Sequence, residues 1–319
     1  MSYKYIEINR FGDPEVLDLK TADKLPEPIG DEVQIKILCT SAAFTDTLIR
    51  RGIYPDVKEK PPITPGYDLV GRIEKIGGNV STVKIGQKVA ALTITGAYAE
   101  YICLPAKELA IVPESVNQND AHSMILTFTT AYQMLTRCAN MKQGQKILVH
   151  GAGGAVGTAF LQLGKLMNLE VYGTAGKSKQ ELILELGGIP IDYKSEDFVE
   201  VIKNKEPEGI DAVFDSIGGA YYGRSLKTLN KKGTLVAFGS YNAVTKVDLI
   251  KDFLKINLWS FIQEAVDGCS QCDSEELPAC VHRRGAAWVS HATQVLEVCS
   301  FTKFPARLPI IAVAPQVSL

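Results

Sequence analysis

The sequence lacks the features of a membrane or secreted protein. None of its apolar runs approaches the roughly 18 consecutive residues that a membrane-spanning helix needs. The first residues, MSYKYIEINRFGD, place charges among apolar side chains, whereas a signal peptide has an uninterrupted apolar region. We therefore expect a cytoplasmic protein without a membrane partner, in a compartment that keeps thiols reduced.

An excess of one charge is also missing. The 319 residues include 34 Lys and Arg against 36 Asp and Glu, with no run of like charges. Nucleic acids and anionic membranes are bound by basic stripes or patches, so neither is expected as a main partner. The apolar share of 46% is ordinary for a globular protein, and the length is sufficient for two domains.

Cysteines are few, and they are unevenly placed along the chain. Cys39, Cys103 and Cys138 stand singly in apolar segments, which predicts small buried side chains. Four more crowd the last part of the chain: Cys269, Cys272, Cys280 and Cys299. With His282 they offer ligand types that zinc uses, but their spacing fits no strong zinc signature. We interpret them as a chance cluster and predict no metal site.

The first 115 residues or so are predicted to form short strands separated by glycine and proline. Apolar and polar residues alternate in these segments, which favours a mostly antiparallel, half-buried sheet or barrel. A helix is expected around Thr45–Arg51. The predicted strands are Glu32–Leu38, Tyr67–Ile76, Gln87–Leu92 and Ala99–Leu104.

From Gln118 the pattern changes to alternating helices and apolar strands, which is typical of a parallel, doubly wound sheet. The boundary is expected within residues 113–122, and after about Ile262 no clear period remains. The predicted strands are Lys146–His150, Glu170–Gly173, Ile189–Tyr193, Ile210–Ser216 and Thr234–Gly239. The predicted helices are Asn119–Cys138, one ending near Met167, Ser178–Leu186, Ser195–Asn204 and Ala220–Leu229.

A glycine-rich loop follows the first strand of this series. Ile147-Leu148-Val149 leads into a segment with the pattern Ala-x-Gly-x-x-Gly, and an apolar helix comes next. Small residues let the chain turn tightly and let a pyrophosphate approach backbone N–H groups at the helix N-terminus. The strand and helix on either side make a dinucleotide site the favoured interpretation. Its residues are Ala152, Gly153, Gly154, Ala155, Val156 and Gly157.

The end of the second strand indicates which dinucleotide is bound. An NAD site usually has an acidic residue there, for the ribose 2′-hydroxyl. This chain has Thr174, Gly176, Lys177 and Lys179 instead, a set that suits a 2′-phosphate and therefore NADPH. Tyr193, at the end of the third strand, is predicted to lie beside the adenosine. The alternative is that the two lysines only solvate the start of a helix.

The histidines give no sequence signal for catalysis. His122, His150 and His291 have no evident carboxylate or nucleophile partner along the chain. We expect them to have core or surface roles.

With these features together, residues 1 to about 260 resemble the zinc-independent quinone oxidoreductases, the zeta-crystallin-like branch of the medium-chain dehydrogenase/reductase superfamily. The resemblance implies an α/β fold with a GroES-like β-barrel catalytic domain and a doubly wound parallel-sheet Rossmann domain, whose sheet edge commonly mediates homodimers in the family. We assign residues 1–118 and 119–262 to these domains, and 263–319 to an atypical segment in place of the usual return to the catalytic domain. The matching segments are Asp46–Pro55, Thr64–Gly71, Val83–Val89, Thr130–Tyr132, the glycine loop, Asp215–Gly219 and Phe238–Ser240.

The resemblance also bears on zinc and on the substrate site. Ala43 and Tyr67 occupy the positions where zinc enzymes of the superfamily have Cys and His, and neither residue replaces those ligands. The quinone reductases commonly have Asn at position 43, so a polar group of the pocket is missing. The resemblance suggests Thr45, Tyr54 and Tyr67 as catalytic candidates. It adds Thr130, Phe238, Gly239 and Ser240 to the cofactor site.

Two hypotheses from different classes follow. The first is an NADPH-dependent, zinc-independent reductase that transfers hydride to a small quinone or an α,β-unsaturated carbonyl. The second is a catalytically silent NADPH-binding protein with a structural or interaction role, which the loss of the pocket Asn and the atypical C-terminal segment favour. A zinc alcohol dehydrogenase is disfavoured by Ala43 and Tyr67.

Overall fold

The computed structural model describes residues 1–54, 57–239 and 241. Chain contacts divide them into two compact units, with the division between Thr129 and Thr130. Each unit is described by itself. The domain limits given above stay a prediction, as does the atypical character of the C-terminal segment, which lies outside the described residues.

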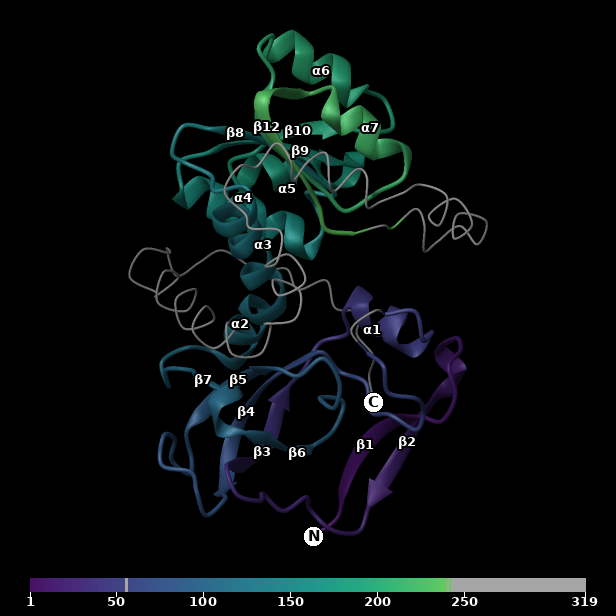
Figure 1. Cartoon of the computed structure of the whole chain (residues 1–319), viewed down its shortest axis with the longest axis vertical. Helices are drawn as coiled ribbons and strands as arrows, with labels where there is room; N and C mark the ends of the chain where they lie inside the picture. Colours follow the sequence, from purple (N-terminus) through teal and green to yellow (C-terminus); the bar gives the residue numbers. More distant parts are fainter. Residues whose placement is uncertain (55–56, 240, 242–319) are drawn as a thin grey trace, which may run out of the picture. The chain divides into compact units, whose positions relative to one another are not determined.

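The first unit is an antiparallel β structure (Figure 1). A hairpin of β1 and β2 is accompanied by a five-stranded sheet in the order β6-β3-β4-β5-β7. The strands are β1 (Tyr3–Ile8), β2 (Leu17–Ala22), β3 (Glu32–Cys39), β4 (Asp68–Ile76), β5 (Lys88–Leu92), β6 (Tyr101–Pro105) and β7 (Ala110–Ile111). The short helices are η1 (Pro14–Val16), α1 (Phe44–Arg50) and η2 (Ala106–Glu108). The predicted strands and the predicted helix are confirmed within a few residues, and the hairpin is an addition to them.

Both faces of the five-stranded sheet are covered, because apolar side chains alternate along its strands. One face buries Val33, Ile35, Leu69 and Val89 in a common core. The other face buries a second set that includes residues of the following helix. The five-stranded sheet is thus packed on both faces. The second set is Val70, Ala90, Ala110, Val112, Val116, Ala121 and Ile125.

A helical stretch runs from Gln118 to Cys138, close to the predicted Asn119–Cys138. The Asn117 side chain caps it by accepting a hydrogen bond from the Asn119 amide at 2.8 Å. Two of its segments are π-helical, with wider turns than an α-helix. No helix in the described part of the chain is long and apolar enough to cross a membrane. The segments are α2 (Gln118–Ser123), η3 (Met124–Phe128), α3 (Thr129–Gln133) and η4 (Met134–Cys138).

The second unit is a parallel sheet in the order β10-β9-β8-β11-β12. The predicted doubly wound architecture is confirmed. The predicted helix Ala220–Leu229 is three residues too long, because β12 already begins at Leu229. The strands are β8 (Lys146–His150), β9 (Glu170–Ala175), β10 (Ile189–Asp192), β11 (Ile210–Asp215) and β12 (Leu229–Ala237). The helices are α4 (Ala155–Leu166), η5 (Lys177–Lys179), α5 (Gln180–Glu185), α6 (Phe198–Lys205) and α7 (Ala220–Leu226).

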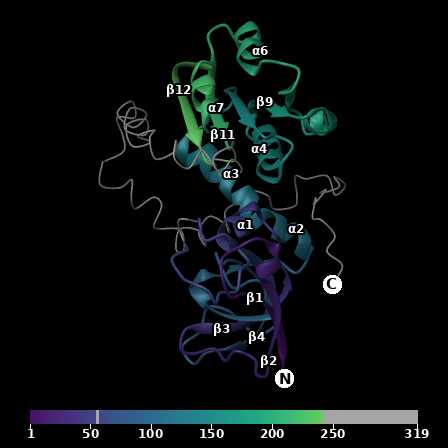
Figure 2. The ribbon, with the colours of Figure 1, turned by 90° about the vertical axis from the view of Figure 1, so that its right-hand side faces the viewer.

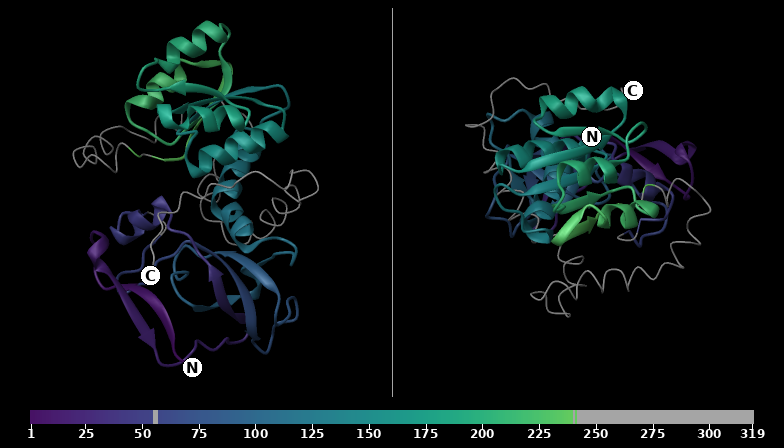
Figure 3. Two further views of the ribbon diagram at one scale, coloured as in Figure 1. Left: turned by 180° about the vertical axis from the view of Figure 1, so that it is seen from behind. Right: turned by 90° about the horizontal axis from the view of Figure 1, so that it is seen from above.

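Helices pack on both faces of the parallel sheet. Figure 2 shows α4 on one side of β9 and β11, with α7 on the other, and Figure 3 shows the ribbon from behind and from above. On the α4 side, the ring of Phe160 lies 4.5 Å from that of Phe214. On the other side, Phe198 and Ile202 of α6 pack with Leu148 and Val213. Side chains of each strand therefore alternate between two helical layers.

The cysteine prediction is wrong in part. Cys39 and Cys103 are half-buried, and Cys138 is exposed. Cys138 ends the helical stretch, and it is exposed although Met134 and Leu135 of the preceding turn are buried. Burial raises the pKa of the Cys39 thiol to about 11, which favours the protonated thiol at neutral pH.

Candidate functional site

The parallel sheet has a point where the strand order reverses. β8 lies at the centre, β9 and β10 extend from one side of it, and β11 and β12 extend from the other. In open α/β sheets, ligands bind outside the carboxyl ends of the strands at such a point. The predicted glycine loop and the segment Asp215–Gly219 follow the two strands that meet there, β8 and β11.

The glycine loop has a shape that only small residues permit. A Cβ on Gly157 would lie 2.4 Å from the Gly151 carbonyl oxygen and 2.5 Å from the Ala152 Cα. Ala152 is fully buried, and its Cβ lies where a side chain on Gly173 would have to go. Helix α4 begins directly after Gly154, so the loop ends at a helix N-terminus with unpaired N–H groups and a partial positive charge. This is the arrangement that binds a pyrophosphate.

The predicted 2′-phosphate residues lie next to this loop. The side chain of Lys179 packs directly over Gly153, so that a Cβ on the glycine would lie 2.7 Å from the lysine Cβ. The side chain of Lys177 is exposed, and that of Lys179 is half-buried. No described residue forms an ion pair with either ammonium. Tyr193 is 48% exposed, and a Cβ on Gly176 would lie 3.9 Å from the edge of its ring. The structure thus brings the predicted adenosine-end residues together.

Hydrogen bonds and close backbone packing connect the segments that follow β11 and β12. The Phe238 amide donates to the Asp215 carbonyl at 3.0 Å, and a Cβ on Gly239 would lie 2.9 Å from the Ser216 carbonyl oxygen. Tyr222 donates to the Gly239 carbonyl at 2.9 Å. Of the three predicted residues here, Phe238 and Gly239 are placed in this way, and Ser240 lies outside the described residues. Thr130, the remaining predicted cofactor residue, is half-buried in α3.

The sequence-based interpretation of His150 is only partly right. The residue is buried in the core as expected, but it does have a nucleophile-type partner. Its Nε2 lies 3.0 Å from the Ser225 hydroxyl, which donates to the Asp215 carboxylate at 2.9 Å. Its Nδ1 lies 3.0 Å from the Thr174 hydroxyl. Ser225 lies 75 residues further along the chain, so no local pattern reveals this contact.

In the first unit, two of the three predicted catalytic residues contact each other. The Tyr54 and Tyr67 hydroxyls are 2.7 Å apart, and their rings meet edge to face with centroids at 5.8 Å. Tyr67 is buried, whereas Tyr54 and Thr45 are half-buried. Each hydroxyl of the tyrosine pair can donate one proton, so the pair can present one hydroxyl proton to a ligand oxygen.

Asp46 holds the backbone of Gly66, the residue before Tyr67. Its carboxylate accepts hydrogen bonds from the Ala43 amide at 2.7 Å and from the Gly66 amide at 3.2 Å. Burial raises the Asp46 pKa to about 6, against the opposing effect of these hydrogen bonds and of one from Tyr98. Asp46 was not among the predicted site residues, although an acidic residue at the third position of a helix is a signal for such a cap.

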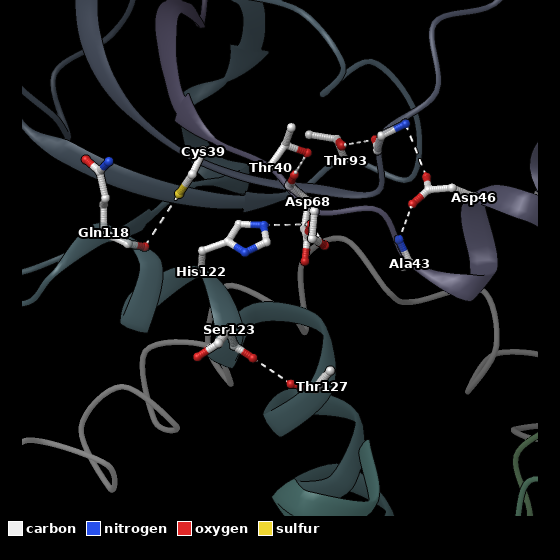
Figure 4. A network of polar contacts seen from close by, with 12 residues as sticks. Cys39, Thr40, Ala43, Asp46, Asp68, Thr93, Gln118, His122, Ser123 and Thr127 are labelled. Carbon is white, nitrogen blue, oxygen red and sulfur yellow. Dashed lines mark hydrogen bonds and ion pairs between the residues drawn. The ribbon is translucent and has the colours of Figure 1, made fainter. Parts of the chain in front are cut away.

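A second buried carboxylate follows Tyr67 directly (Figure 4). Asp68 is 1% exposed and accepts from the Ser41 hydroxyl at 3.1 Å. His122 Nε2 lies 2.9 Å from the same oxygen of Asp68. The prediction that His122 has no carboxylate partner is therefore wrong. The two residues are 54 positions apart, and only the packing of α2 on β4 brings them together.

The side chains at positions 43 and 67 do not suit a metal ion. The Ala43 side chain has no ligand atom, and the Tyr67 hydroxyl is hydrogen-bonded to Tyr54. Among the described residues, no group of three or more His, Cys, Asp or Glu side chains is arranged to hold a metal ion. The cysteine cluster from Cys269 to Cys299, with His282, lies outside the described residues, as does His291.

Two family descriptions match the chain. Residues 30–114 match the alcohol dehydrogenase GroES-like domain, and residues 155–282 match the zinc-binding dehydrogenase family. The second match extends about 20 residues past Ile262. A quinone oxidoreductase of Pongo abelii is 32% identical over 245 residues, which is 75% of this chain and 74% of that protein. The chain belongs to the quinone oxidoreductase family.

The chain is also similar to vesicle membrane proteins and to solved quinone oxidoreductase structures. A synaptic vesicle membrane protein VAT-1 homolog of Danio rerio is 32% identical over 76% of this chain and 50% of its own length. The chain spans about half the length of several curated relatives of this kind. The crystal structure of Escherichia coli quinone oxidoreductase complexed with NADPH is 30% identical, with a TM-score of 0.69 over 74% of this chain and 73% of that one. The predicted family and the predicted two-domain fold are thereby confirmed.

Proposed function

We propose that this family member is an NADPH-dependent, zinc-independent reductase of quinones or α,β-unsaturated carbonyls. The observation that carries the proposal is the loop at residues 151–157, where added side chains would collide with backbone and where Lys179 crosses Gly153. The NADPH complex of the Escherichia coli relative supports the choice of cofactor.

NADPH fits the residues that are present. The N-terminus of α4 and the glycines before it receive the pyrophosphate, because donors and space are both available there. Lys177 and Lys179 receive the 2′-phosphate, since their ammonium groups have no ion pair among the described residues and residues 176–180, directly after β9, include no carboxylate. Tyr193 lies against the adenosine. When bound, NADPH supplies the hydride for the reduction.

The substrate side is assigned to the first unit. The Tyr54–Tyr67 pair donates a hydrogen bond to the carbonyl oxygen of the acceptor, and Thr45 lines the same site. An acceptor that gains a hydride needs one further proton, which the hydroxyl pair or solvent delivers. No step is assigned to zinc, because Ala43 and Tyr67 provide no suitable pair of ligands. Positioning and hydrogen bonding are sufficient for an electron-poor acceptor.

The proposal is tested by following NADPH oxidation in the presence of 1,4-benzoquinone and of a 2-alkenal, each with a matched reaction lacking protein. Turnover of at least one acceptor class is expected. Tight NADPH binding without oxidation by either class would replace the reductase with the silent cofactor-binding protein. Absence of both binding and turnover would remove both hypotheses.

A further inference from the structure

A buried chain of hydrogen bonds crosses the second unit behind the proposed cofactor site. It contains Thr174 at the end of β9, His150 at the end of β8, Ser225 in α7 and Asp215 at the end of β11. The four side chains are between 0 and 3% exposed. The separations are 3.0 Å, 3.0 Å and 2.9 Å in that order. Four elements that are distant in the sequence are therefore connected.

The Asp215 carboxylate, at one end of this hydrogen-bonded network, sets the direction of the other hydrogen bonds for a neutral imidazole. The Asp215 carboxylate can only accept, so the Ser225 hydroxyl donates to it. Ser225 then accepts from His150, which must carry its proton on Nε2. Nδ1 of a neutral imidazole is an acceptor, so the Thr174 hydroxyl donates to it. For a neutral imidazole, the tautomer with its proton on Nε2 therefore satisfies every hydrogen bond of the network.

Burial favours the neutral form of His150. Burial lowers the pKa of the imidazole to about 4, despite the opposing effect of Asp215. The rings of Phe198 and Tyr221 pack edge to face against it, with centroids at 4.7 and 5.3 Å. A neutral imidazole with one N–H and one acceptor nitrogen is the species that the chain requires.

Both ends of the chain hold loops that face the proposed cofactor site. At one end, the Gly151 amide donates to the Thr174 hydroxyl at 3.4 Å, at the start of the glycine loop. At the other, the second oxygen of Asp215 accepts from the amides of Ile217 at 2.8 Å and Gly218 at 3.0 Å. The two loops on either side of the switch point are thus fastened to one buried network.

We propose that Thr174, His150, Ser225 and Asp215 are positioning residues that preset the glycine loop and the 216–219 turn for NADPH. Their side chains are buried behind the loops, so they act through the backbone amides that they hold. This inference rests on the proposed function for the identity of the ligand. It differs from the prediction that Thr174 contacts the cofactor, since its hydroxyl is used by His150.

Two variants of the full chain test the inference, Thr174→Val and Ser225→Ala, each of which removes one hydroxyl. Affinities for NADPH and for adenosine 2′-monophosphate are measured by fluorescence titration. We expect NADPH affinity to fall by about tenfold, the effect of losing one good hydrogen bond. Affinity for adenosine 2′-monophosphate should stay unchanged, because its partners are at Gly176–Lys179 and Tyr193. Thr174→Ser keeps the hydroxyl and should restore NADPH binding.

Thr228→Val is the matched control for lost stability. Thr228 is 1% exposed, and its hydroxyl donates to the Ser225 backbone carbonyl at 2.7 Å. This hydrogen bond does not belong to the network of the four side chains. Thr228→Val should lower the thermal unfolding temperature as the test variants do and leave NADPH affinity unchanged. Equal NADPH affinity in Thr174→Val, Ser225→Ala and wild type would overturn the inference, as would a proportional loss for both ligands.

Amide hydrogen exchange without any ligand separates this inference from the proposed function. Exchange at residues 151–157 and at Gly218 should be faster in Thr174→Val and Ser225→Ala than in wild type and Thr228→Val. Failure of the wild type to bind NADPH would remove the proposed function, whereas the exchange rates would still show whether the network holds the loops. Unchanged exchange in the two test variants contradicts the network's role.

Discussion

At the scale of single residues, Lys177 is the clearest test of cofactor choice. Its side chain is exposed and has no ion pair among the described residues, so Lys177→Gln should leave the fold intact. We expect NADPH affinity to fall by about 1.5–3 kcal/mol, the value of a charge-assisted hydrogen bond. NADH affinity should change little.

Calorimetric titration of both nucleotides measures this difference. Lys203→Gln, at an exposed position of α6, is the control and should affect neither. Parallel losses for NADPH and NADH in Lys177→Gln would mean that the lysine only solvates the start of its helix.

The tyrosine pair gives a second prediction at this scale. Tyr54→Phe and Tyr67→Phe each remove one member of a 2.7 Å hydroxyl contact. We expect kcat to fall by about 100-fold in at least one of them, which is the lower range for a positioned proton donor. The KM for NADPH should stay unchanged, because the pair is assigned to the acceptor.

Steady-state kinetics with a quinone acceptor measures this effect, and Tyr5→Phe in the hairpin is the control within the same unit. Unchanged kcat in both Tyr54→Phe and Tyr67→Phe would assign proton delivery to solvent.

At the scale of secondary-structure elements, two glycines in helices of the second unit should respond in opposite directions. A Cβ on Gly157 in α4 would lie 2.4 Å from the Gly151 carbonyl oxygen, whereas a Cβ on Gly223 in α7 has no atom within 4 Å. Gly157→Ala should destabilise the protein by about 1–3 kcal/mol through overpacking. Gly223→Ala should stabilise it by about 0.5–1 kcal/mol through helix propensity.

Thermal unfolding of the two glycine variants checks the signs. Shifts in the same direction for both would show that Gly157 does not have the close backbone contact on which the cofactor loop depends.

The elements were largely predictable because their signals are local. β8 was predicted at its observed limits, since a short apolar run precedes the glycine loop, and α1 was predicted within one residue. The contacts of His122 with Asp68 and of His150 with Ser225 were not predictable. They join residues 54 and 75 positions apart, and only tertiary packing decides which polar groups meet. Cys138 was misjudged because an apolar neighbourhood in sequence does not fix the face of a helix.

At the scale of the whole molecule, two buried groups should make stability depend on pH with opposite signs. Burial lowers the pKa of His150 from 6.5 to about 4, so between these values the unfolded chain binds a proton that the native one does not. Stability contributed by His150 is therefore lost as pH falls through this window. Burial raises the pKa of Asp46 from 3.8 to about 6. Its contribution is lost as pH rises through nearly the same window.

Urea unfolding between pH 4 and pH 7 separates the two contributions. The free energy of unfolding of His150→Asn, relative to wild type, should improve towards low pH by on the order of 3 kcal/mol. That of Asp46→Asn should improve towards high pH by a comparable amount. A difference that is constant with pH for either variant would mean that the group titrates normally in the folded protein.

The central claim is that the unit built around residues 151–157 binds NADPH in preference to NADH. Titration of the full chain with each nucleotide, followed by nicotinamide fluorescence, tests it most directly. We predict saturable NADPH binding with an affinity at least about tenfold above that for NADH, since the 2′-phosphate adds a charge-assisted contact. Equal affinities, or tighter binding of NADH, would contradict the account.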